Sequence, residues 1–165
     1  MRAALLLALV ALLGIGSSAS ERTEYLSRAA KPTPKSWSLG QTWAFLLLDK
    51  KGAILGSMTL RFTDQQGVSC IPPPYSPATH EMVAKWKRVE TIEHRGTEAP
   101  NTVLTRPLTY VLEGAALTLG ANDQCDNFLE LFGELTANGV TGRYSALTLR
   151  PSETLGSFYG VPIEN

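Results

Sequence analysis

The stretch that decides the fold is "QTWAFLLLDKKGAILGSMTLRF", residues 41–62. Residues 41–48 are mostly aromatic and aliphatic, and "DKKG" at 49–52 is a turn signal. Residues 53–62 follow, with an alternation that is typical of a strand. Their predicted buried face carries Ile54, Met58, Leu60 and Phe62. Two such runs joined by a short loop containing glycine predict a β-hairpin.

Further short strands follow with similar spacing. "TDQQG" (63–67) predicts a turn, "VSCI" (68–71) a third strand, and "PPPYSP" (72–77) an end to pairing, because proline lacks a backbone donor. "LTYVL" and "ALTL" (108–112 and 116–119) predict a second hairpin. "GSFYGVPI" (156–163) predicts the last strand.

A third hairpin is predicted where "FLELFGEL" (128–135) meets "VTGRYSALTL" (140–149). The connecting "TANG" contains Asn138-Gly139, a pair that favours the positive φ angles of a type I′ turn.

Residues 80–94 fit two interpretations. The apolar spacing of Met82, Trp86, Val89 and Ile92 suits a helix capped by Thr79. The β-branched residues favour a strand from about Trp86 to His94, with a turn of helix before it, and we adopt this second interpretation.

The whole pattern gives about eight short strands and little helix. It predicts an all-β fold, either an antiparallel up-and-down barrel or a sandwich. Barrel closure is favoured because it removes exposed strand edges. Glycines scattered through the strands predict bends and bulges where a barrel curves.

The N-terminus resembles a secretory signal peptide. Arg2 precedes an apolar run at 3–15, which is shorter than the roughly 18–20 residues of a membrane span, and small residues then predict cleavage near Ala19. An anchor helix is the alternative. We therefore expect a signal peptide at 1–19, a flexible leader at 20–36 and one barrel-like domain at 37–165, secreted or periplasmic.

Charge excludes some classes of partner. Without the signal peptide the net charge is about −1, which argues against nucleic acid and against a polybasic membrane patch. One domain is expected, because the chain is too short to build two cores.

The two cysteines, Cys70 and Cys125, predict one disulfide in an exported chain. No C-x-x-C spacing favours a redox pair. Two free thiols, or a bridge between two chains, are the alternatives.

Metal and cofactor binding are not predicted. Zinc would need clustered ligands, and the only histidines, His80 and His94, are far apart in sequence. Oxygen ligands for calcium could come from Asn122, Asp123, Asp126 and Asn127. We interpret these four Asn and Asp residues as turn formers, whose side chains accept hydrogen bonds from the nearby backbone.

No catalytic residue is assigned, since neither G-x-S-x-G nor H-E-x-x-H is present. A secreted hydrolase that uses His80 or His94 as a base, beside Glu81 or Glu93, is the alternative function, and a structural envelope protein without a ligand is another.

Most aromatic residues are expected in the core, but those at a barrel mouth would suit an apolar ligand or a protein partner. The predicted contact residues are Trp43, Tyr75, Trp86 and Tyr110. Tyr75 lies in the proline-rich loop 71–80, which is expected to protrude.

"GQTWAF" at 40–45 resembles the first strand of the calycins, the lipocalin and avidin-like secreted barrels. Gly40 and Trp43 are spaced G-x-x-W, whereas lipocalins have G-x-W. "SWSLGQTW" (36–43) is also similar to small exported META-type domains. The resemblance implies a barrel. We expect this barrel to bind either a small apolar ligand or a protein partner. If the partner is a protein, the chain could be an inhibitor of an extracellular enzyme.

The disulfide is open to a direct test. Non-reducing peptide mapping of the exported protein is expected to recover Cys70 and Cys125 in one linked pair of peptides. Closing a loop of about 55 residues should stabilise the fold by roughly 4 kcal/mol. Alkylation of both thiols without prior reduction would contradict the prediction.

Overall fold

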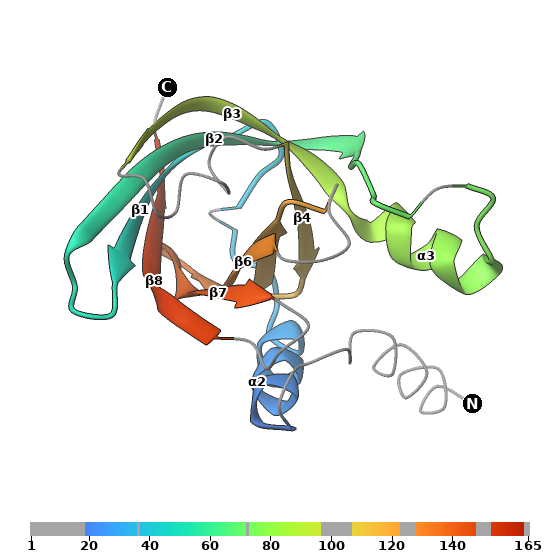
Figure 1. Cartoon of the computed structure of the whole chain (residues 1–165), viewed down its shortest axis with the longest axis horizontal. Helices are drawn as coiled ribbons and strands as arrows, with labels where there is room; N and C mark the ends of the chain where they lie inside the picture. The colour runs from blue at the N-terminus through green and yellow to red at the C-terminus, as the bar shows by residue number, and fades with distance from the viewer. Residues whose placement is uncertain are drawn as a thin grey trace.

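The chain forms a closed barrel of eight antiparallel strands, each paired with its neighbours in sequence, with β1 paired to β8 (Figure 1). This computed structural model describes residues 19–35, 37–71, 73–96, 107–122, 128–147 and 153–163. The strands are β1 Thr42–Asp49, β2 Ile54–Gln66, β3 Lys87–Gly96, β4 Leu108–Glu113, β5 Ala116–Gly120, β6 Phe128–Thr136, β7 Gly139–Leu147 and β8 Glu153–Pro162. The helices are α2 Ala19–Ala29 and α3 Pro77–Lys85. The predicted all-β class is confirmed, and the barrel rather than the sandwich is present.

The opening hairpin is confirmed by the pairing of β1 with β2. Its turn is organised by the Asp49 carboxylate, which accepts hydrogen bonds from the backbone N–H groups of Lys51 and Ala53, both at 2.8 Å. Ile54 does not lie on the buried face as predicted, because it stands at the strand end beyond a bulge at 47/48 and is 67% exposed.

The second strand is longer than predicted. β2 continues to Gln66, so the turn expected at 63–67 and the third strand expected at 68–71 are both wrong. Pairing with β3 explains this, because the register extends to Gln66 opposite Lys87 and the Thr63 hydroxyl donates to the Arg88 carbonyl at 2.8 Å. That partner is distant in sequence and overrides the local turn signal.

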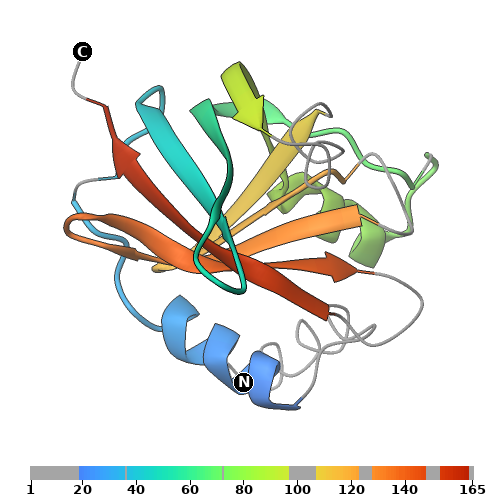
Figure 2. The ribbon, with the colours of Figure 1, turned by 60° about the vertical axis from the view of Figure 1, so that its left-hand side comes forward.

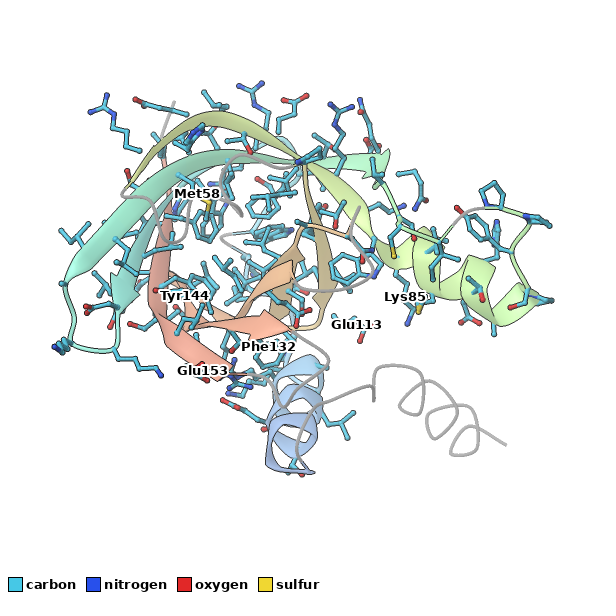
Figure 3. The ribbon with its side chains drawn as sticks, in the orientation of Figure 1. Met58, Lys85, Glu113, Phe132, Tyr144 and Glu153 are labelled. Atoms are coloured by element: carbon cyan, nitrogen blue, oxygen red, sulfur yellow. The ribbon has the colours of Figure 1, made fainter. Side chains whose placement is uncertain are left out.

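The ambiguous segment divides as predicted into a short helix and then a strand, α3 and β3. The helix begins earlier than the predicted Thr79 cap. The Ser76 side chain is the N-cap and accepts from the Thr79 N–H at 3.2 Å, with Pro77 at the first helical position. Lys85 at the helix end pairs with Glu113 of β4 at 2.9 Å, so α3 is held outside the barrel wall (Figure 3).

The hairpin of β6 and β7 is confirmed, but its turn is displaced by one residue. Thr136 pairs with Gly139, so Ala137 and Asn138 are the two loop residues. Gly139 has a φ of 149°, and a Cβ there would lie 2.3 Å from the Gly160 carbonyl oxygen of β8. The positive φ and the close approach of β8 therefore both favour glycine at this position.

The barrel interior is filled by side chains from all eight strands. The largest fully buried ones are Trp43, Tyr144, Phe45, Phe62 and Phe158. Met58 and Tyr144 are labelled in Figure 3 and point into this interior. Bulges occur next to Gly56 and Gly156 on the strands of these glycines, as expected of glycines in a curved sheet.

Helix α2 begins at Ala19, the predicted cleavage position, and its other residues belong to the segment predicted as a leader; it lies along the outside of the barrel (Figure 2). The guanidinium of Arg28 lies 4.9 Å from the centre of the Phe132 ring on β6, and that of Arg143 on β7 lies 5.1 Å from it. Glu24 forms ion pairs with both arginines. Cation–π and ionic contacts thus attach α2 to β6 and β7.

The segment that joins α2 to β1, which we call the strap, comprises residues 30–35 and 37–41. It crosses the β4–β5 turn, where the Thr33 hydroxyl donates to the Gly114 carbonyl at 2.7 Å. Lys31 pairs with Glu134, and the Gly40 N–H donates to the Phe62 carbonyl at 2.9 Å. The strap therefore passes over the end of the barrel at which β1 begins.

Gly114 is the position at which this crossing can be tested. Its φ is 59°, and a Cβ would lie 2.2 Å from the Ala29 carbonyl oxygen and 2.3 Å from that of Lys31. We expect Gly114→Ala to displace the strap, to lower the unfolding midpoint and to accelerate trypsin cleavage after Lys35.

The matched control is Gly52→Ala. Gly52 also has a positive φ, 85°, but its added Cβ would meet no atom within 4 Å. This variant should lose about 1 kcal/mol from backbone strain without faster cleavage of the strap. Equal cleavage rates for the two variants would show that the strap does not depend on Gly114.

Candidate functional site

Four aromatic rings gather where the strap reaches the barrel, and we call Trp37, Trp43, Phe62 and Tyr110 the mouth cluster. Trp37 belongs to the strap, and its ring centre lies 4.4 Å from Phe62, 5.3 Å from Trp43 and 6.0 Å from Tyr110. The last three are buried, whereas Trp37 is only partly buried. Trp37 therefore covers the barrel end as a plug that no barrel strand supplies.

The mouth cluster continues into the barrel as a connected aromatic path. Phe45 lies 6.2 Å from Phe62 and 5.9 Å from Phe158, measured between ring centres. Tilted and edge-on arrangements such as Phe62 against Tyr110, at 4.9 Å and 86°, are the favoured ones for aromatic pairs. The rings therefore form one continuous aromatic group from the strap into the barrel interior.

Two buried residues of the mouth cluster, Trp43 and Tyr110, carry a polar atom. The Tyr110 hydroxyl donates to the Thr63 carbonyl at 2.9 Å, so its proton is used. The Trp43 indole Nε1 is buried with no hydrogen-bond partner, and the Trp43 side chain is 0% exposed. A buried donor without a partner costs about 1–3 kcal/mol, which marks Trp43 as the unusual group of the cluster.

Two buried tyrosines have shifted acidities. Burial raises the pKa of Tyr110 above its usual value of 10, and the negative charge of Asp64 raises it further. Burial likewise raises the pKa of Tyr144, with Asp49 adding to the effect. Both hydroxyls are therefore neutral at physiological pH, and neither can act as an anionic base there.

The structure brings together only two of the four predicted contact residues. Trp43 and Tyr110 share the mouth cluster, whereas Tyr75 and Trp86 lie beside α3, which projects from the barrel (Figure 1). The Tyr75 ring is 6.3 Å from the His80 ring, and Trp86 is the C-cap residue of α3. Sequence reasoning missed Trp37 as a site residue, although it opens the quoted "SWSLGQTW".

The two histidines occupy separate, exposed positions. His80 is in α3, and His94 is in β3 opposite Met58. The described residues contain no group of three or more His, Cys, Asp or Glu side chains able to hold a metal ion. Of the oxygen ligands considered for calcium, Asp123, Asp126 and Asn127 lie outside the described residues.

Cys70 lies beside the segment that leads to its predicted partner. Its backbone N–H donates to the Asn122 carbonyl at 2.8 Å, three residues before Cys125. Within the described ranges no cysteine is free. Cys125 itself lies outside them, so the disulfide stays a prediction.

A second surface feature is the outer face of β1 and β8. Opposite residues in a ladder share a face, so Ala44 with Val161 and Leu46 with Tyr159 form an apolar outer strip. Tyr159 is 49% exposed and Val161 is 51% exposed. Exposed apolar area of this kind is a common feature of interaction surfaces.

In the parts of the chain that the structure describes, no helix is both long and apolar enough to cross a membrane. No family model, curated protein or solved structure matches the chain. The resemblance to calycins or META-type domains therefore stays a prediction.

The raised pKa of Tyr110 predicts an alkaline loss of stability. Because the folded pKa exceeds the unfolded one, the contribution is fully present below pH 10 and is lost as pH rises through the folded pKa. The urea midpoint, measured between pH 8 and 11.5, is expected to fall less steeply for Tyr110→Phe than for the native chain.

Tyr159→Phe, which changes an exposed tyrosine in the same way, is the control and should keep the native slope. If Tyr110→Phe shows the native slope as well, ionisation of Tyr110 does not oppose folding.

Proposed function

We propose that this chain is an exported, non-catalytic β-barrel protein that binds a small apolar molecule at the mouth cluster. The single observation that supports this is the position of Trp37, a partly buried aromatic plug supplied by the strap. Eight-stranded barrels have interiors of a size that side chains can fill or that can hold one small ligand. The proposed ligand takes the place of the Trp37 ring.

The apolar lining supports binding through the hydrophobic effect. Displacing Trp37 would leave the faces of Trp43, Phe62 and Tyr110 available to a bound ring. Burial of apolar surface contributes about 25 cal/mol per Å². The observed affinity would be lowered by the fraction of molecules in which Trp37 fills the site, since only the open form can bind.

Export and a Cys70–Cys125 disulfide are part of the proposal. The hydrogen bond from the Cys70 N–H to the Asn122 carbonyl supports the pairing, because Asn122 is only three residues before Cys125 in the sequence. A disulfide at this position would be expected in an oxidising compartment.

A protein partner is the second candidate, and the apolar outer face of β1 and β8 favours it. Side chains such as Tyr159 and Val161 could be covered by another protein without burying a charge. This candidate does not require the mouth cluster to open.

A neutral apolar dye distinguishes the two candidates. N-phenyl-1-naphthylamine becomes fluorescent in an apolar site, and we expect saturable binding to the native chain. Trp37→Ala should bind it about tenfold more tightly, because the competing plug is gone.

Trp86→Ala removes the tryptophan at the C-cap of α3, which is not one of the four rings of the mouth cluster, and should leave dye affinity unchanged. Absence of saturable binding by both the native chain and Trp37→Ala would contradict the ligand proposal and would leave the protein partner as the remaining candidate.

A further inference from the structure

We infer that the Trp43 indole N–H is the donor that selects the ligand, which would be a neutral apolar molecule with one hydrogen-bond acceptor such as a ketone carbonyl. This inference rests on the proposed function, since it concerns the same mouth cluster. It is carried by the one buried polar atom of the cluster that has no hydrogen-bond partner, Trp43 Nε1.

The chemistry of indole limits what can satisfy this atom. An indole nitrogen only donates, so its partner must be an acceptor. The Tyr110 hydroxyl proton is already given to the Thr63 carbonyl, and it therefore does not compete for a ligand acceptor. Fully buried and without a partner, the Trp43 N–H would gain more from a ligand acceptor than an exposed donor would.

The surroundings favour a neutral ligand over a charged one. The buried side chains of the core carry no charge, and the buried polar residues among those described are threonines and a serine. A carboxylate placed there would lose its hydration without gaining an ionic partner. The negative charge of Asp64, close enough to act on Tyr110, would oppose an anion further.

The rings indicate the shape of the ligand. Trp37 lies edge-on to Phe62, with an angle of 60° between the rings, and next to Trp43. A fused aromatic ligand replacing the indole of Trp37 could keep these contacts and direct a carbonyl oxygen toward Trp43 Nε1. The ligand class is thus an aromatic or similarly flat molecule that bears one carbonyl.

A matched pair of compounds tests this. In 2-acetylnaphthalene and 2-isopropenylnaphthalene the carbonyl oxygen is exchanged for a CH₂ group of similar shape. Competition against N-phenyl-1-naphthylamine on the native chain is expected to give the ketone about a tenfold advantage, the size of one good hydrogen bond. Trp43→Phe, which keeps an aromatic ring but loses the donor, should bind both compounds equally.

A second measurement needs no variant that could fail to fold. In ¹⁵N-labelled native chain, the Trp43 indole N–H resonance should move on addition of the ketone and should move much less with the olefin. The Trp86 indole resonance is the internal reference, and resonances can be assigned with Trp37→Phe and Trp86→Phe.

The outcomes separate this inference from the proposed function. Equal affinity for the two compounds, with no selective shift at Trp43, would overturn the role of the N–H while leaving apolar binding intact. An internal water that keeps its contact with the Trp43 N–H when the ketone is bound would do the same. Failure of both compounds and of the dye to bind would overturn the proposed function itself.

Discussion

The pairing of β1 with β8 is the constraint on which the rest of this structure depends. It closes the sheet, so the two strands that would otherwise be edges satisfy each other's backbone groups. Closure also creates an interior, which the inward-facing side chains of every strand must fill. Where strands approach closely, as at Gly139 beside Gly160, a side chain is not tolerated. Large aromatic residues can then occupy the space that remains.

Closing the wall leaves the ends of the barrel to be covered by other means. At the end where β1 begins, the strap supplies Trp37, and the strap is held in turn by its crossing over Gly114 and by the docking of α2. These contacts are polar and cation–π interactions at the surface, which contribute less than the packing of the core. Apart from the Trp37 ring itself, the cover is therefore attached by weaker contacts than those that hold the core together, and it lies over the cluster that contains the buried donor of Trp43.

The hairpins could be predicted from sequence because alternation and turn residues are local signals. β2 extends to Gln66 through its pairing with β3, a partner that is distant in sequence. The β6–β7 turn lies at 137–138, because Gly139 pairs with Thr136 and belongs to the strand. Local signals do not contain either pairing, so local reasoning misplaced both. Trp43 and Tyr110 were predicted as contacts because they are large aromatics in strands. Trp37 was missed, since only the path of the strap brings it to them. Tyr75 and Trp86 were grouped with them although nothing local indicates that α3 projects from the barrel.

A covered mouth makes stability and binding oppose each other. The contacts of Trp37 with Phe62 and Trp43 stabilise the closed form, and a ligand must exceed them before it gains any affinity. Apolar contact alone exchanges one ring for another, so part of the gain from burying the ligand is offset by the loss of the Trp37 contacts. A hydrogen bond to Trp43 Nε1 is different, because Trp37 leaves that atom without a partner and an acceptor-bearing ligand would not. The unsatisfied donor would therefore favour exchange of the plug for the ligand, and it would do so selectively.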